Sequence, residues 1–232
     1  MLMLQAREPP ALPRTGRASR QVWEGKMAQR RGKSERKTEE VEIKVQTNLD
    51  EPRGRRRKAE ITLSAGWQEP GIEVRLIEHF FAQVYRFSNF GGGMVGKGDS
   101  THHLTEDLGI CWGQAFKEAL GDKAGIMRTA SHIMPMQGTV VTVSVDLSGR
   151  PWANLALNMA TTPMREMLRH ILTDMAIHSA FDLFVKVEYL GDNAIQDEHH
   201  AIETVGKALG KVLKEATRIE GTEILSTKGT LE

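Results

Sequence analysis

Apolar and polar residues alternate along five short stretches of the chain, the pattern of β-strands with one buried face. In the first half, the alternation covers residues 41–45 and 59–63. In the second half, it covers residues 141–145, 155–159 and 183–187. The sequence therefore predicts strands at these places, distributed over both halves of the chain.

Longer stretches carry an apolar residue at every third or fourth position, which predicts amphipathic helices. One helix is expected over about residues 72–87, and a corresponding one over about 164–178. Two further helices begin at pairs of histidines, at positions 102 and 199. The glycine-rich segment 91–98 precedes the first pair and is only weakly marked as a strand.

Two segments of the chain are copies of one another. Residues 102–119 read HHLTEDLGICWGQAFKEA and residues 199–216 read HHAIETVGKALGKVLKEA, with eight of 18 positions identical and no gap. Unrelated segments would share about one. Since the patterns before each copy also correspond, each half reads β-β-α-β-α. We therefore expect an α+β fold built by tandem duplication, in which helices cover one face of each sheet and the two helix layers pack together.

Composition narrows the class of protein. The chain of 232 residues is long enough for one large domain or two small ones, and a formal net charge of +1 indicates no particular class of charged partner. No apolar run approaches the roughly 18 residues of a membrane-spanning helix. Cys111 is the only cysteine, which excludes an intrachain disulfide and favours a cytoplasmic location.

The beginning of the chain differs from the rest. Residues 1–37 contain ten Lys or Arg but only three Glu, together with Pro9, Pro10 and Pro13. Such a composition buries little apolar surface, so residues 1–36 are expected to be a disordered basic tail. Three other interpretations stay open: translation starting at Met27, a transit peptide and a nucleic-acid-binding arm.

The two copies each carry a candidate set of metal ligands. His102 and Glu106 are four residues apart and His103 and Glu106 three apart, so on a helix they share one face. Adjacent histidines point about 100° apart, so a pair can serve two metals, or a metal and a substrate. Imidazole with carboxylate suits Mn, Fe, Zn or Ni. The alternative without a metal is two amphipathic helices that merely begin with histidines. The second copy repeats the spacing with His199, His200 and Glu203.

Four glycines also repeat within the predicted helices. They fall on the face that bears the glutamates, at Gly109, Gly113, Gly206 and Gly210. Glycine lowers helix stability, so its presence indicates that another helix approaches closely at these positions.

Several short motifs, in their order and spacing, resemble those of the imidazoleglycerol-phosphate dehydratase family of histidine biosynthesis. The resemblance extends from about Lys37 to Leu231. The matching segments are Thr38–Ile43, Glu78-His79, His102–Asp107, Ala119–Lys123, Gly125–Arg128, Asp146–Pro151, His199–Glu203 and Ser226–Gly229.

The resemblance implies a fold and an organisation. It implies two tandem repeats like domain 2 of ribosomal protein S5, with helix layers packed between two four-stranded sheets. The repeats would occupy residues 37–134 and 135–222, followed by a phosphate-binding segment at 223–232. It further implies a homo-oligomer of 24 subunits with active sites at subunit interfaces. The small phosphorylated substrate is the expected partner, rather than a membrane or a nucleic acid.

The resemblance also implies an activity and its residues. The chain would be a hydro-lyase that converts imidazole glycerol phosphate to imidazole acetol phosphate with two Mn²⁺ per active site. Glu40 would transfer the proton. The metal ligands would be His79, His102, His103, Glu106, His199, His200 and Glu203, and the phosphate would bind to Gln83, Arg128, Arg150, Lys207, Ser226 and Lys228.

The chain departs from the family pattern at two places. A histidine expected in the motif T-L-H is replaced by Phe184, and two carboxylates of P-M-D-E are replaced by Gln137 and Gly138. His170 is a possible substitute ligand, although a histidine on a helix surface is the simpler interpretation. These departures keep two alternatives open beside an active dehydratase: a divergent metal-binding relative with altered or no catalysis, and a nucleic-acid-binding module.

Overall fold

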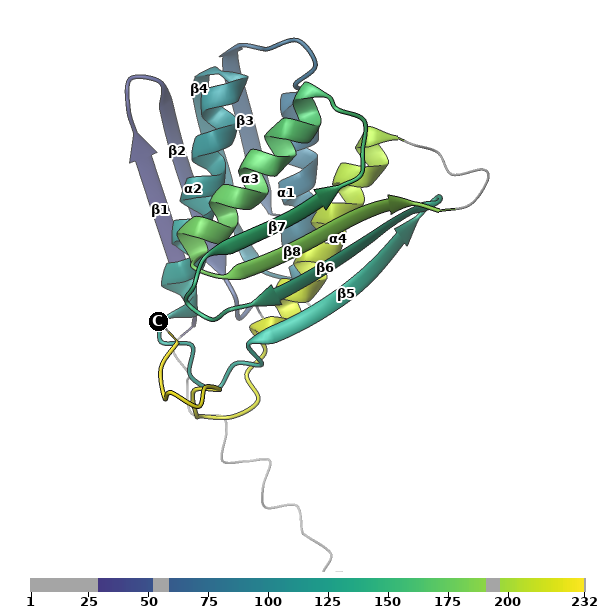
Figure 1. The fold of residues 1–232 in the computed structure, drawn as a ribbon. Helices are drawn as coiled ribbons and strands as arrows, with labels where there is room; N and C mark the ends of the chain where they lie inside the picture. Colours follow the sequence, from purple (N-terminus) through teal and green to yellow (C-terminus); the bar gives the residue numbers. More distant parts are fainter. Residues whose placement is uncertain (1–28, 52–58, 191–196, 232) are drawn as a thin grey trace, which may run out of the picture.

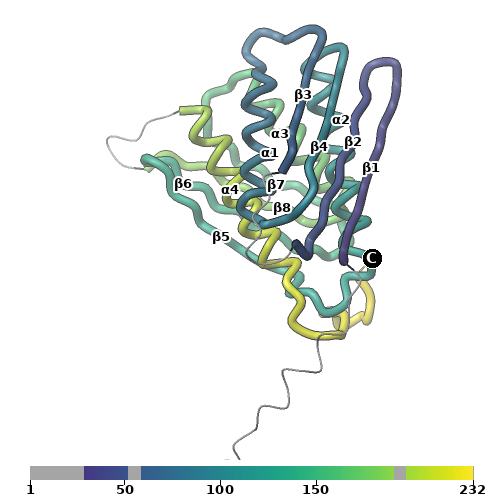
Figure 2. The backbone as a smooth tube through the Cα atoms, turned by 180° about the vertical axis from the view of Figure 1, so that it is seen from behind, coloured from purple at the N-terminus to yellow at the C-terminus, as the bar shows by residue number. Residues whose placement is uncertain are grey.

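Two four-stranded sheets enclose four helices in the computed structural model, which describes residues 29–51, 59–190 and 197–231. Each sheet presents its apolar face inward, and the helices lie between the sheets (Figures 1 and 2). The expected α+β fold with helix layers between two four-stranded sheets is therefore confirmed. Residues 1–28, most of the predicted basic tail, lie outside the described residues.

The first sheet belongs to the first repeat and has the strand order β1-β2-β4-β3. Strand β2 pairs antiparallel with both β1 and β4, whereas β3 runs parallel to β4. Val41, Ile43 and Val45 alternate inward and are at most 3% exposed. The elements are β1 (Arg31–Lys37), β2 (Val41–Asn48), β3 (Glu60–Trp67), α1 (Val74–Ser88), β4 (Gly91–Ser100) and α2 (Thr101–Leu120).

The second sheet repeats this topology with the order β5-β6-β8-β7, and β7 runs parallel to β8. Val141, Val143 and Val145 occupy the positions that the corresponding valines and isoleucine hold in the first sheet. The elements are β5 (Thr129–Met136), β6 (Thr139–Asp146), β7 (Trp152–Leu157), α3 (Pro163–Ser179), β8 (Asp182–Tyr189) and α4 (Glu198–Ala216).

The helices of the two repeats pack in pairs, α1 with α4 and α2 with α3. The repeated glycines lie in these contacts, as predicted. A Cβ atom at Gly109 would lie 2.9 Å from the Cβ of Asp174 on α3, and one at Gly206 would lie 2.8 Å from the carbonyl oxygen of Phe80 on α1. Each repeat thus contributes one helix to each pair, and a helix that begins with histidines always packs against a helix from the other repeat.

Two segment boundaries differ from those expected. Strand β1 begins at Arg31, inside the predicted tail, and β5 begins at Thr129, before the predicted repeat boundary at residue 135. Each repeat therefore has an additional strand ahead of the β-β-α-β-α order. The reason at β1 is close packing rather than apolar burial, because a Cβ atom at Gly32 would lie 1.9 Å from the carbonyl oxygen of Ala115.

Helix length and hydropathy decide whether a helix could span a membrane. Among the described residues, no helix is both long and apolar enough to span a bilayer.

Candidate active site

Three potential metal ligands meet where α4 begins beside α1. The ligand atoms of His79, His199 and Glu203 all lie within 4.8 Å of one another. The Glu203 Oε2 atom is 3.3 Å from His79 Nε2 and 3.6 Å from His199 Nε2, and the two imidazole rings stack at 5.1 Å between centroids. We call these three residues the α4 cluster. The fold therefore joins a histidine of the first repeat to two ligands of the second.

The start of α4 is fixed by its N-cap. The Asp197 carboxylate accepts hydrogen bonds from the backbone N–H groups of His199 at 2.7 Å and His200 at 3.4 Å. The His200 ring turns away from the α4 cluster's stacked pair, at 77° to His199. Its Nδ1 atom is buried without a hydrogen-bond partner in the described part of the chain. This nitrogen lies 3.8 Å from Asp197 Oδ2, so the N-cap carboxylate faces the His200 ring as well as the backbone.

Two further side chains attach to the α4 cluster. Lys207 Nζ donates to Glu203 Oε1 at 2.7 Å, and Gln83 Nε2 lies 3.1 Å from His79 Nε2. Burial by itself raises the pKa of the Glu203 carboxyl, but the hydrogen bonds and charges of Lys207 and His79 outweigh it and place the pKa below its usual value. Glu203 is therefore held as a carboxylate, the form that ligates a cation.

The first copy is arranged more openly at the start of α2. His102 Nε2 is 3.9 Å from Glu106 Oε2, and the Ser100 hydroxyl caps the helix by accepting from His103 N–H. His103 Nδ1 lies 2.8 Å from Asp99 Oδ1, and this hydrogen bond is the main cause that raises the pKa of His103. The negative charges of Glu40 and Glu106 add to the effect.

His170 lies opposite this first copy. Its ring centroid is 6.0 Å from that of His102, across the α2–α3 contact. The relation matches that of His79 to His199 across the α1–α4 contact, because the repeats are equivalent. One turn later, burial and the charges of Glu106 and Asp107 raise the pKa of Asp174 to about 6. We call His102, Glu106 and His170 the α2 cluster.

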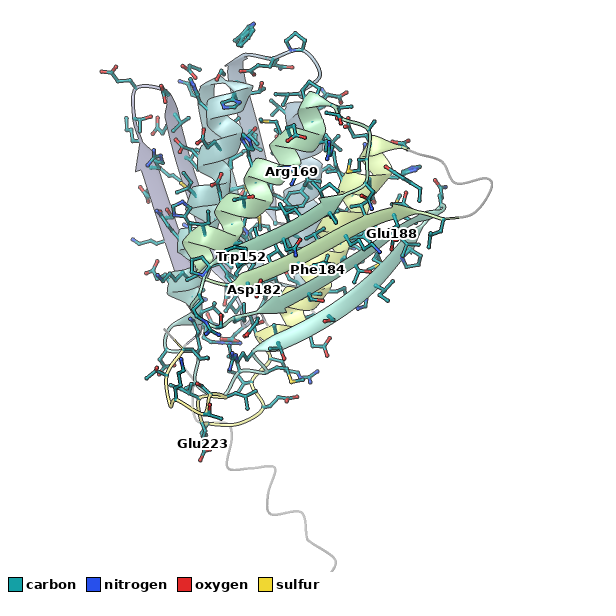
Figure 3. The ribbon with its side chains drawn as sticks, in the orientation of Figure 1. Trp152, Arg169, Asp182, Phe184, Glu188 and Glu223 are labelled. Atoms are coloured by element: carbon teal, nitrogen blue, oxygen red, sulfur yellow. The ribbon has the colours of Figure 1, made fainter. Side chains whose placement is uncertain are left out.

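Phe184 lies elsewhere. Its neighbours Leu183 and Val185 on β8 are fully buried against the helices, so Phe184 points to the outer face of the sheet (Figure 3). A histidine at this position would not reach the helix starts. The replacement at Phe184 therefore removes no ligand from either cluster, and the expectation that a metal ligand is missing there is corrected.

Four of the six predicted phosphate-binding residues line one cleft of about 540 Å³ at the other end of the helices. The cleft lies between the loops after α2 and β6 and the C-terminal segment. Arg128 donates to both oxygens of Asp146 and to the carbonyl of Leu225, which leaves two of its five N–H groups. Among the described residues, no ion pair involves the other two cations of this cleft, Arg150 and Lys228. The four residues are Arg128, Arg150, Ser226 and Lys228.

The predicted phosphate-binding set is thus divided within one chain. Gln83 and Lys207 contact the α4 cluster, and they do not line the cleft. A ligand that contacts all six residues must therefore lie between separate surfaces of the chain or of its copies.

Glu40 lies in the exposed turn between β1 and β2. Its carbonyl oxygen accepts from the N–H of Asp99, and its carboxylate charge contributes to the raised pKa of His103. The predicted proton-transfer residue is therefore near the first histidine pair rather than near the α4 cluster.

Some site residues were not identified from the sequence. Asp99 bonds to the His103 ring and Asp197 caps α4. The signal for Asp197 was its N-cap position, whereas Asp99 lies one residue before the N-cap of α2, Ser100. Gln137 and Gly138 form the β5–β6 turn with φ values of 46° and 86°. The preceding Met136 places its Sδ atom 3.6 Å from Lys207 Nζ. The residue just before this turn therefore contacts Lys207, which in turn bonds to Glu203 of the α4 cluster, although the turn itself carries no carboxylate.

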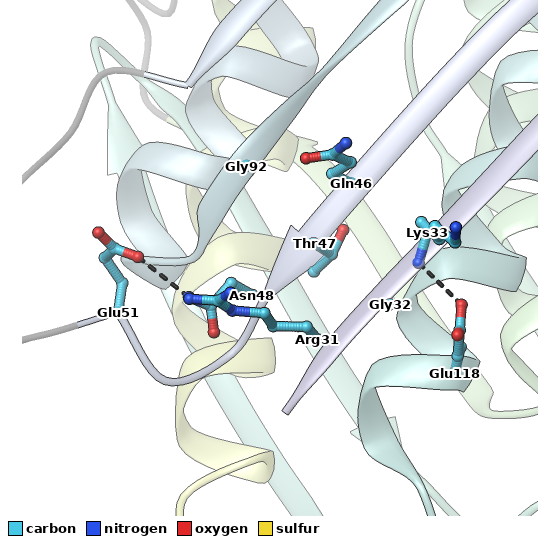
Figure 4. Close-up of a pocket in the computed structure, with 9 residues that line it drawn as sticks. All are labelled: Arg31, Gly32, Lys33, Gln46, Thr47, Asn48, Glu51, Gly92 and Glu118. Carbon is cyan, nitrogen blue, oxygen red and sulfur yellow. Dashed lines mark hydrogen bonds between the residues drawn. The ribbon is translucent and has the colours of Figure 1, made fainter. Parts of the chain in front are cut away.

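A second pocket, of about 520 Å³, lies on the first sheet where β1, β2 and β4 meet (Figure 4). It is polar, with Arg31 and Lys33 beside Glu51 and Glu118. No histidine lines it, so it is distinct from the candidate active site.

Comparison with known proteins identifies the family. A family model described as imidazoleglycerol-phosphate dehydratase matches residues 72–168 and 162–224. The chain belongs to the imidazoleglycerol-phosphate dehydratase family. Members of this family are hydro-lyases of histidine biosynthesis, so the expected enzyme class is confirmed.

Individual dehydratases resemble the chain over most of its length. That of Dehalococcoides mccartyi strain CBDB1 is 33% identical over 89% of this chain and 100% of its own, and that of Desulforudis audaxviator is 35% identical over 87% and 98%. The crystal structure of the Pyrococcus furiosus enzyme in complex with (S)-C348 matches with a TM-score of 0.66 and 28% identity, over 85% of this chain and 99% of that one. The Staphylococcus aureus enzyme matches in fold, with a TM-score of 0.58 at 21% identity.

Proposed function

We propose that this chain is a metal-dependent imidazoleglycerol-phosphate dehydratase, which removes water from imidazole glycerol phosphate to give imidazole acetol phosphate in histidine biosynthesis. The observation that carries the proposal is the pair of equivalent clusters, in which a histidine helix start from one repeat meets a histidine from the other. Family membership supplies the reaction, and the clusters supply a place for it.

The residues present offer one compact and one more open set of donors for divalent cations. The α4 cluster offers two imidazoles and a carboxylate within 4.8 Å, and the α2 cluster offers the same donor types. The rings of His103 and His200 lie at 76° and 77° to those of His102 and His199 and remain as further donors. These donors suit Mn²⁺, the expected cofactor. When bound, such a pair of ions supplies Lewis-acid stabilisation of negative charge on the imidazole ring.

The chain's own residues would handle the rest of the substrate. Arg150, Lys228 and the Ser226 hydroxyl offer charge-assisted and neutral hydrogen bonds to a phosphate group, and Arg128 adds its remaining N–H groups. The Glu40 carboxylate, exposed beside the first histidine pair, would accept the proton removed from the glycerol chain. The hydroxyl group next to the ring would then leave with a proton as water, and the resulting enol would tautomerise to the ketone of imidazole acetol phosphate.

The divided phosphate-binding set supports assembly of the active site from several copies of the chain. Lys207 and Gln83 would contact a substrate at the α4 cluster, while the cleft of another subunit would hold its phosphate. A closed homo-oligomer, expected to contain 24 subunits, satisfies this requirement by symmetry. The proposal predicts that isolated subunits are inactive.

A divergent metal-binding relative is the second candidate. The β5–β6 turn favours it, because Gln137 and Gly138 replace carboxylates that the family pattern contains, and this turn reaches Lys207 through Met136. Such a protein would bind Mn²⁺ without producing imidazole acetol phosphate.

A direct assay distinguishes the two candidates. The full chain, loaded with Mn²⁺, is mixed with imidazole glycerol phosphate, and imidazole acetol phosphate is measured. We expect turnover by the natural chain, a loss of about 10²–10⁴-fold in Glu40→Gln, and little change in Glu39→Gln, the exposed neighbouring control. Stoichiometric Mn²⁺ binding without turnover would favour the divergent relative.

A further inference from the structure

The C-terminal wall of the cleft forms no helix or strand, so another segment must hold it in place. The loop after α2 does so. Met127 N–H donates to the carbonyl oxygen of Arg218 at 2.8 Å. Gly125 N–H donates to the carbonyl oxygen of Glu223 at 2.9 Å, and the Gly125 carbonyl oxygen accepts from Glu220 N–H at 2.8 Å. Figure 1 shows this C-terminal segment, in yellow, folding back beside the teal loop.

Two side-chain contacts then fix the part that carries the phosphate-binding residues. Arg128 Nη1 donates to the carbonyl oxygen of Leu225 at 2.6 Å, and Lys123 Nζ donates to that of Leu231 at 3.0 Å. Residues 226–230 lie between these two carbonyls and are mostly exposed. The loop with Ser226 and Lys228 is therefore fixed at both ends.

Lys123 differs from the other cations of this region in its burial. Its residue is 7% exposed, although lysine is seldom buried, and Leu231 is 8% exposed. A buried ammonium group is stable only where hydrogen-bond acceptors replace water, and the Leu231 carbonyl oxygen is one acceptor that does so. Lys123 does not line the cleft, whereas Arg128 does. Its effect on a ligand is therefore indirect.

We propose that Lys123 is a positioning residue for phosphate binding. Its buried ammonium group holds Leu231, and through it the loop that presents Ser226 and Lys228 to the cleft. The inference rests on the proposed function, in which these two residues bind the substrate phosphate.

Hydrogen exchange on the full, assembled protein tests the anchor without reference to catalysis. The amides of Ser226, Lys228 and Gly229 make local hydrogen bonds within the loop. We expect them to exchange about tenfold faster in Lys123→Met and at an intermediate rate in Lys123→Arg. Lys117→Met, an exposed lysine in the last turn of α2, is the matched control and should leave the rates unchanged. Natural exchange rates in Lys123→Met would overturn the proposal.

Binding measurements test the consequence. Lys123→Met should raise KM for the phosphorylated substrate, and the Kd for inorganic phosphate, about tenfold, with kcat and Mn²⁺ content unchanged. Faster loop exchange without weaker phosphate binding would also overturn the proposal. An inactive natural protein would refute the proposed function, while the exchange rates would still decide the anchor.

A second variant covers the case in which Lys123→Met does not assemble. Leu231→Ala keeps the carbonyl oxygen that accepts from Lys123 but removes the buried side chain that holds this carbonyl in place, so its loop exchange should also accelerate. The double variant of Leu231→Ala with Lys123→Arg should exceed the larger single effect only slightly, because both changes act on the position of Leu231. Unchanged exchange in Leu231→Ala, or additive effects in the double variant, would contradict the proposal.

Discussion

Replacing Gly206 by alanine tests how closely the helix packing and the metal site are linked. In an isolated helix this change stabilises by about 1 kcal/mol. Here the new Cβ would lie 2.8 Å from the Phe80 carbonyl oxygen and 3.0 Å from the Gln83 Cβ, and neither atom can rotate away. Overpacking of this kind costs about 2–3 kcal/mol. The variant should therefore be destabilised by about 1–2 kcal/mol.

The same displacement affects the α4 cluster, because α1 carries both Gln83 and His79. Thermal unfolding of the assembled protein should show a Tm lower by about 2–8 °C, at about 2–4 °C per kcal/mol. Calorimetric titration should show weaker Mn²⁺ binding. Gly221→Ala is the control, since a Cβ there has nothing within 4 Å. A rise in Tm in Gly206→Ala, with natural Mn²⁺ affinity, would refute this reasoning.

Three other predictions concern ligands, caps and pH. His170→Gln should lower the Mn²⁺ bound per chain or weaken its affinity at least tenfold, whereas Phe184→His should leave binding unchanged; equal effects in a metal titration would contradict the assignment of the α2 cluster. Asp197→Ala should destabilise the protein by about 1 kcal/mol and weaken Mn²⁺ binding, while Asp197→Asn keeps a good N-cap; equal Tm values for the two variants would show that the cap is unimportant. Burial by itself raises the pKa of Asp50, but hydrogen bonds and charge from Arg30 outweigh it, so the folded-state pKa lies below the unfolded value of about 3.9. The stabilisation by the Asp50 carboxylate is present above that unfolded value and is lost as pH falls through the folded value. The Tm difference between the natural chain and Asp50→Asn should therefore be constant above about pH 5 and shrink below pH 4. A Tm difference that grows with acid would contradict the direction of the pKa shift.

The sequence predicted those parts of the fold that a local pattern determines. Alternation placed the central strands, and the repeated His-His-x-x-Glu segment placed the starts of α2 and α4. Strand β1 has no such pattern, because its inward positions include Gly32, which meets α2 through backbone contact. Strand β5 carries the partly buried Ala130, His132, Met134 and Met136 rather than a strongly apolar face.

Site assembly was less predictable because it depends on contacts between distant residues. His79 and His199 are 120 residues apart, yet the α1–α4 contact stacks their rings. By spacing alone, His170 looked like a surface histidine and Phe184 like a lost ligand. The orientation of β8 and the α2–α3 contact reverse this interpretation. The division of the phosphate-binding residues between two places also had no local signal.

Anomalous scattering from a crystal of the Mn²⁺-loaded, assembled protein tests the central claim most directly. The account predicts two Mn²⁺ per chain, one ligated by His79, His199 and Glu203 and one by His102, Glu106 and His170. Assemblies without anomalous peaks at these two clusters, or with Mn²⁺ bound only elsewhere on the chain, would contradict it.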